Sequence, residues 1–244
     1  MQIEALAIRL RPRSPLEAAD LGVRLCQSNA RQVYLCYAMV FVPVAILSLA
    51  TVEWAGWLPS VLIWWLKPWM DRTILLVLSR AAFGQTTTPR DLWQAGRSVW
   101  LRQLFLSLTL RRLSPWRAFT QPVYQLEGLS FDRIASRVRQ LRRGRSGQAL
   151  LVTNAFALAE AALSIALLSL GYWFAPQSEE FNWSVLLSGA DSTMLSVFTS
   201  VSYALVVLFL EPFYVASGFA MYLNRRAELE AWDIEQEFRL AFAA

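Results

Sequence analysis

The sequence predicts an all-α integral membrane protein with four transmembrane helices and further cytoplasmic or interfacial amphipathic helices. Three observations lead to this fold class. Hydrophobic residues make up 56% of the chain, more than the roughly 45–50% of ordinary soluble domains. They are concentrated in long runs, and about 20 apolar residues are enough to cross the hydrocarbon layer of a bilayer. Almost all of the arginines lie outside these runs.

The four spans differ in how well they fit a bilayer. The second contains charged residues, and the fourth is longer than a bilayer requires, so we expect it to tilt, to bend at Pro212 or to project into the cytoplasm. Residues 1–15 lack the short apolar core and cleavage site of a signal peptide, so the first span is expected to direct the chain to the membrane. The spans are expected at about 33–52, 58–78, 150–174 and 193–223.

The distribution of basic residues sets the predicted orientation. Arginines lie in residues 1–32, in residues 80–147 and in the tail from Asn224, whereas the connections around Glu53 and across 175–192 contain neither Lys nor Arg. Segments rich in Lys and Arg stay in the cytoplasm. Four crossings place all of them on that side. We therefore expect a multi-pass protein of the bacterial inner membrane, residues 1–244 forming one membrane domain with both termini in the cytoplasm.

Residues 92–110 are the main rival to this topology, because they are apolar enough to form a fifth span. Spanning would move the arginines that follow them to the outside. Thr88, Pro89 and Asp91 instead have the pattern of a helix start, with an N-cap, a first-position proline and an acid in the first turn. We predict an interfacial amphipathic helix, with a helix packed on the protein itself as the alternative. Its apolar face would contain Leu92, Val99, Trp100, Leu104 and Leu108.

Five ionisable residues fall inside the predicted spans, where charged side chains face a protein interior or a wet cavity. They are Lys67, Asp71, Arg72, Glu160 and Glu211. At 1.5 Å per residue, Lys67 is ~13 Å below the outer end of its span and Glu160 ~15 Å above the inner end of its own, so we expect them to meet. The other three should lie closer to the cytoplasm, with Arg72 neutralised by Asp71 or Glu211. A structural network and a proton or solute pathway are the two interpretations.

Two cytoplasmic segments carry charge of opposite sign. A basic run just before the third span is typical of a topology determinant that contacts anionic lipid headgroups; a protein partner is the alternative, and nucleic acid is not expected. The acidic segment 224–241 predicts a helix that packs on the Arg-rich connection 80–147, binds a partner or presents a solvated face. The basic run consists of Arg133, Arg137, Arg139, Arg142, Arg143 and Arg145.

The sequence offers little for catalysis or metal binding. It contains no histidine, the most common general base and metal ligand. Cys26 and Cys36 are not in a metal-ligand spacing, and we expect structural roles for both. No phosphate-binding glycine loop or nucleophile motif occurs. We therefore predict no catalytic, cofactor-binding or metal-binding residues, no cofactor and no enzymatic activity.

Several longer motifs resemble one bacterial family. They are residues 64–72, 78–84, 111–115, 121–129, 211–214, 223–226 and 232–235, which include Trp-Trp-Leu-Lys-Pro-Trp-Met-Asp-Arg and Trp-Asp-Ile-Glu. The family is the N-terminal membrane region of proteobacterial membrane proteins of unknown function. Its longer members continue into a transglutaminase-associated soluble domain and are encoded near MoxR-type AAA+ ATPases. The chain ends at Ala244, so that domain is not expected within it.

The resemblance implies membership of a membrane assembly and implies no reaction. We therefore expect a non-enzymatic subunit that scaffolds or anchors a larger membrane or envelope complex. Its expected partners are anionic lipids on the cytoplasmic side and other membrane subunits. The alternative is a transporter or channel-like module that uses the intramembrane charges.

Overall fold

The computed structural model describes residues 13–96, 99–100, 108–109, 114–174 and 193–230. These residues form helices and connections, and no strand occurs among them. The helices are α1 (Pro15–Ser28), α2 (Ala30–Leu49), α3 (Leu58–Ala82), α4 (Pro89–Gly96), α6 (Arg117–Leu126), α7 (Phe131–Arg142), α8 (Ser146–Phe174) and α10 (Thr193–Glu230). The predicted all-α class is confirmed for this part of the chain.

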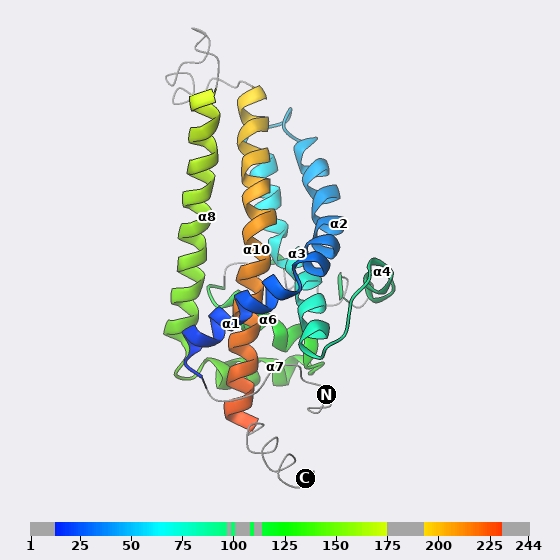
Figure 1. The fold of residues 1–244 in the computed structure, drawn as a ribbon, viewed down its shortest axis with the longest axis vertical. Helices are drawn as coiled ribbons and strands as arrows, with labels where there is room; N and C mark the ends of the chain where they lie inside the picture. The colour runs from blue at the N-terminus through cyan, green and yellow to red at the C-terminus, as the bar shows by residue number, and fades with distance from the viewer. Residues whose placement is uncertain (1–12, 97–98, 101–107, 110–113, 175–192, 231–244) are drawn as a thin grey trace.

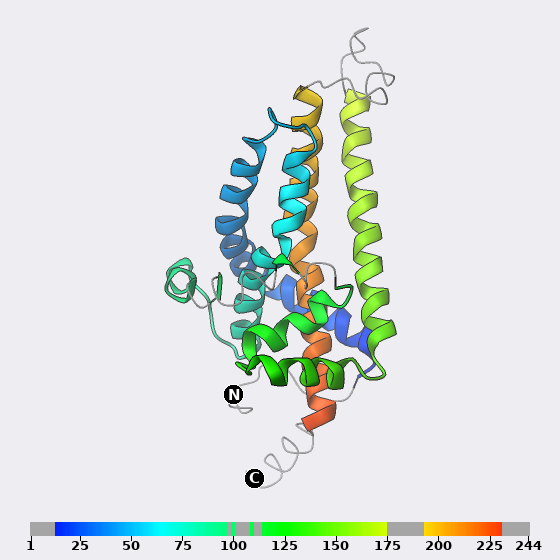
Figure 2. The same cartoon turned by 180° about the vertical axis from the view of Figure 1, so that it is seen from behind.

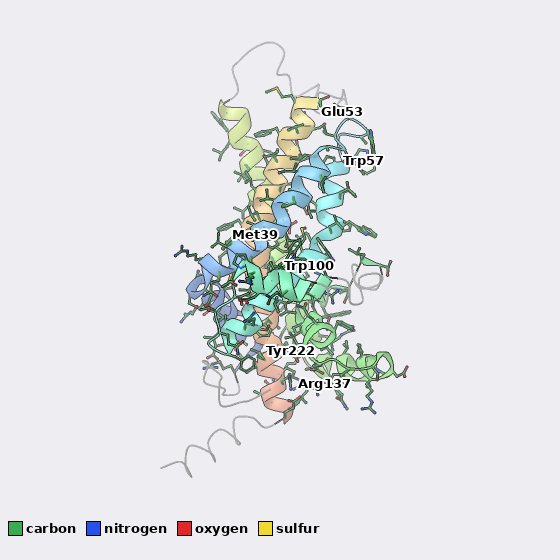
Figure 3. All side chains as sticks on the ribbon, turned by 90° about the vertical axis from the view of Figure 1, so that its right-hand side faces the viewer. Met39, Glu53, Trp57, Trp100, Arg137 and Tyr222 are labelled. Atoms are coloured by element: carbon green, nitrogen blue, oxygen red, sulfur yellow. The ribbon has the colours of Figure 1, made fainter. Side chains whose placement is uncertain are left out.

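The helices form an upper bundle and a lower body, as oriented in Figure 1. In the upper bundle α2, α3, α8 and the first half of α10 run side by side. In the lower body α1, α6 and α7 cross the second half of α10, which extends through both parts (Figures 1 and 2). Glu53 and Trp57 lie near the upper end of α2 and α3, and Arg137 lies in the lower body (Figure 3).

Three described helices are long and apolar enough to cross a membrane: Ala30–Leu49, Ser146–Leu170 and Thr193–Glu230. This composition identifies a membrane protein. α3 has 25 residues, but four charged residues interrupt its apolar sequence: Lys67, Asp71, Arg72 and Arg80. α10 has 38 residues, about 57 Å of helix. The last predicted span is therefore longer than a bilayer requires, as expected. Residues 224–230 continue α10, and the rest of the predicted helix 224–241 lies outside the described residues.

Glycines allow α1 and α6 to approach α10 closely. A Cβ on Gly22 of α1 would lie 2.3 Å from the carbonyl oxygen of Ala216. A Cβ on Gly218 of α10 would lie 2.4 Å from the carbonyl carbon of Ala118 on α6. Small residues let helix backbones come together in this way. The Gly218 contact fixes the start of α6, and therefore Arg117, against α10.

The predicted start of α4 is present in the structure. The Thr88 N–H donates to Asp91 Oδ2 at 2.9 Å, and the Asp91 N–H donates to Thr88 Oγ1 at 3.3 Å. This reciprocal pair is a capping box. The hydrogen bonds from the Thr88 backbone and hydroxyl hold the pKa of Asp91 below its usual value.

The apolar side of α4 and the residues after it packs on the chain itself. Leu92 and Val99 are buried. Trp100 Nε1 donates to Thr73 Oγ1 on α3 at 3.1 Å, and its ring centroid is 6.1 Å from that of Trp69. α4 is seen nearly end-on in Figure 1, so its axis crosses those of the long helices. Packing on the protein was the alternative in the sequence analysis, and the contacts of these residues favour it; Leu104 lies outside the described residues.

We predict that Gly218→Ala destabilises the protein, because the added methyl group must push α6 away from α10. Overpacking of this kind costs about 1–3 kcal/mol. Gly147→Ala on α8 is the matched control, since nothing lies within 4 Å of a Cβ there. Thermal unfolding in detergent should show a lower midpoint for Gly218→Ala and no loss for Gly147→Ala. Equal midpoints for the two variants would mean that the close contact between α6 and α10 is absent.

Candidate functional site: a buried charge network beside a cleft

Five ionisable side chains from four helices meet where the upper bundle joins the lower body. Lys67 and Asp71 come from α3, Arg117 from α6, Glu160 from α8 and Glu211 from α10. Residues four apart on a helix share a face, so Lys67 and Asp71 point to the same side of α3. All except Glu160 are buried, with relative exposures between 0% and 8%.

Glu211 is the centre of this charge network. Its Oε2 lies 2.6 Å from Lys67 Nζ, and its Oε1 lies 2.6 Å from Arg117 Nη2. Lys67 Nζ also lies 2.7 Å from Glu160 Oε2. Arg117 Nη2 also lies 3.2 Å from Asp71 Oδ2. The charges therefore alternate in a continuous row from α8 through α3 and α10 to α6 and back to α3.

Two tyrosines of α10 extend the network. The Tyr203 hydroxyl donates to Glu160 Oε1 at 2.9 Å, so both oxygens of this carboxylate are bound by other helices. The Arg117 guanidinium lies 5.3 Å from the ring centroid of Tyr214, within the range of a cation–π interaction. These contacts tie α8 and α6 to α10 at the level of Glu211.

The pair of Lys67 and Glu160 that their depths predict is present. Glu211 lies at the level of Lys67 and not deeper, because α10 begins farther out: Glu211 is ~27 Å along α10 from Thr193, whereas Lys67 is only ~13 Å along α3. Arg117 is the arginine that lies beside both Asp71 and Glu211. Arg72 was expected to neutralise one of these two carboxylates. The side chain of Arg72 is buried.

Sequence reasoning missed Arg117, because it is one of many arginines in the connection 80–147. The nearby signal is the motif Arg-Arg-Leu-Ser-Pro at 111–115, which the resemblance includes but whose charge pattern does not single out Arg117. Only the fold shows that the first residue of α6 points into the bundle.

A cleft of about 780 Å³ adjoins the network between α3, α8 and α10. Lys67, Arg117 and Glu160 line it, together with hydroxyl groups that include those of Ser60 and Tyr203. Its volume is within the range of small-molecule pockets, about 300–1,000 Å³. The cleft exists because α8 packs loosely: of its described side chains, few are buried, and these lie near its start.

The predicted basic run in and after α7 divides into paired and exposed arginines. Arg137 Nε donates to Glu127 Oε2 at 3.0 Å, and its Nη2 contacts Glu230. Arg145 Nη2 lies 2.9 Å from Glu228 Oε1. The acidic end of α10 therefore packs on the Arg-rich connection of its own chain, one of the three expected arrangements.

The other four arginines of the run make different contacts. The Arg142 guanidinium lies 3.4 Å from the ring centroid of Trp116, where it stacks. Arg133, Arg139 and Arg143 are exposed. The structure therefore leaves these three side chains accessible to an external anionic group.

The two cysteines are free thiols buried in the core. Burial raises the pKa of Cys26 to about 12, so this thiol stays protonated at neutral pH and is a poor nucleophile. Among the described residues no cluster of three or more His, Cys, Asp or Glu is arranged to hold a metal ion.

No protein-family model, curated protein or solved structure matches this chain. The function is therefore inferred from the geometry of the network and its surroundings.

We predict unequal effects of neutralising the two ends of the Lys67–Glu160 pair. Lys67→Met leaves both Glu160 and Glu211 without their ammonium partner, at a cost on the order of 3–5 kcal/mol. Glu160→Gln costs less, about 1 kcal/mol, because Lys67 keeps Glu211 as a partner. The double variant should be more stable than the sum of the two losses implies. Thermal midpoints in detergent test this; strictly additive losses would show that the two residues do not interact.

Proposed function

We propose that the chain is a four-pass protein of the bacterial inner membrane with both termini in the cytoplasm, and that α3 crosses the membrane in addition to α2, α8 and α10. The charges of α3 support this, because they are buried among other helices and do not face lipid. The exposed Trp54 and Trp57 in the connection from α2 to α3, and Trp173 near the end of α8, also support it. Tryptophan is enriched at the membrane–water interface.

Within that topology, we propose a non-enzymatic subunit that scaffolds or anchors a membrane complex. The observation that carries this proposal is that the network charges contact one another across four helices, so they serve to hold the bundle together. A pathway for ions would need charged groups that a passing ion can displace. The family resemblance, with its association with MoxR-type AAA+ ATPases, agrees with a role in an assembly.

The lower body offers two kinds of contact in this proposal. The exposed Arg133, Arg139 and Arg143 contact anionic lipid headgroups, since α7 leads directly into the start of α8 and basic residues just before a span lie near the headgroups. Replacing all three with Gln should reduce the anionic phospholipid that the purified protein retains. The compact body of α1, α6 and α7 provides the surface that anchors cytoplasmic parts of the complex.

A transporter or channel-like module remains the second candidate, and the cleft favours it. Lys67 and Glu160 line a space of about 780 Å³ between helices, where a solute could exchange with their charges. In this case the same pair would serve in transport as well as in packing.

We predict that the protein migrates in gently solubilised native membranes as part of an assembly larger than its own 27.7 kDa. Lys67→Met combined with Glu160→Gln should preserve this assembly, because the paired replacement maintains helix packing. Native gel electrophoresis with identification of the co-migrating subunits tests this. Migration of the wild-type protein alone, together with proton or solute flux in liposomes that the double variant abolishes, would instead support a transporter.

A further inference from the structure

The charge network contains more acidic than basic groups. Three carboxyl groups, those of Asp71, Glu160 and Glu211, face two cations, Lys67 and Arg117. If all five groups were ionised, one negative charge would remain uncompensated within the network. An uncompensated charge away from water is costly, and a buried acid avoids this cost by holding its proton.

The position of Asp71 shows where the excess lies. Its side chain has no exposed surface, and no hydrogen bond from the described residues reaches either of its oxygens. Arg117 Nη2 lies 3.2 Å from one of them, but the same nitrogen lies closer, at 2.6 Å, to Glu211. Asp71 is therefore the carboxyl group with the weakest cationic compensation.

The carboxyl groups of Asp71 and Glu211 approach the same guanidinium nitrogen: Arg117 Nη2 lies 3.2 Å from Asp71 Oδ2 and 2.6 Å from Glu211 Oε1. When two carboxyl groups share a buried site, one of them keeps its proton, because two negative charges at short distance repel each other. Burial of both carboxyl groups beside one guanidinium nitrogen therefore favours one bound proton.

We propose that Asp71 and Glu211 form a binding site for one exchangeable proton, with the proton on Asp71 and the negative charge on Glu211. The assignment follows from the two cations on Glu211. With one proton bound, two carboxylates balance Lys67 and Arg117. Binding takes a proton from water to an Asp71 oxygen, and release returns it.

Groups from every neighbouring helix set the affinity of this site. Lys67 and Arg117 attract the negative charge of the pair, whereas Glu160 competes for Lys67. Tyr37 on α2 also faces the pair; it is fully buried, and its hydroxyl makes no hydrogen bond to the described residues. Lys67 and Arg117 both line the cleft, so the cleft adjoins the two cations that contact Glu211.

Infrared difference spectroscopy of the purified full chain between neutral and alkaline pH tests the site. The wild-type protein should show the carbonyl stretching band of one protonated carboxylic acid at neutral pH, shifted in heavy water and lost at alkaline pH. Asp71→Asn should lack this band and keep its thermal midpoint, because an amide is neutral and has nearly the shape of the acid. Asp20→Asn, on an exposed pair with Arg24, is the control and should keep the band.

Glu211→Gln separates the two members of the pair. It removes the carboxylate that both cations bind, so it should lower the thermal midpoint even at neutral pH, unlike Asp71→Asn. Absence of the acid band from the wild-type protein, its persistence in Asp71→Asn, or unfolding of Asp71→Asn would each overturn the proposal. These outcomes do not depend on whether the protein belongs to a complex.

Discussion

Removing the Glu211 carboxylate from water is unfavourable unless cations accompany it, and the arrangement of the bundle follows from where those cations originate. Lys67 reaches Glu211 from α3 and Arg117 reaches it from α6, each at 2.6 Å. Both helices must therefore meet α10 at this residue. Lys67 also binds Glu160, which brings α8 to the same level. A buried ion pair contributes little net stability, but losing one partner is costly, so the network selects this packing over others.

The two halves of α10, on either side of Glu211, pack differently. Its first half contributes apolar side chains to the upper bundle, and several of them are exposed as a membrane-facing surface requires. Most residues of its second half are buried, since Gly22 and Gly218 let α1 and α6 come very close. The result is a tightly packed lower body and a more open upper bundle, in which the loosely packed α8 leaves the cleft.

Hydropathy was sufficient to predict the helical membrane class and the approximate positions of the four long helices, because lipid imposes length and polarity directly on the sequence. Helix rise was also sufficient to pair Lys67 with Glu160. Arg117 was not predictable, since its role depends on how α6 folds back onto α10. Likewise, the basic run after Phe131 did not show which arginines the acidic end of α10 would neutralise. Such contacts between segments far apart in the chain leave no local pattern.

The central role of Glu211 requires that it form one buried unit with Arg117, and a double-mutant cycle measures this directly. Thermodynamic unfolding of Arg117→Met, Glu211→Met and the double variant gives their coupling energy. We predict that each single replacement is strongly destabilising and that the double replacement recovers much of the loss, with a coupling of about 2–3 kcal/mol. The double variant remains balanced, because Lys67 keeps Glu160 and Asp71 keeps its proton. Additive losses, within about 0.5 kcal/mol, would contradict the central role of this pair.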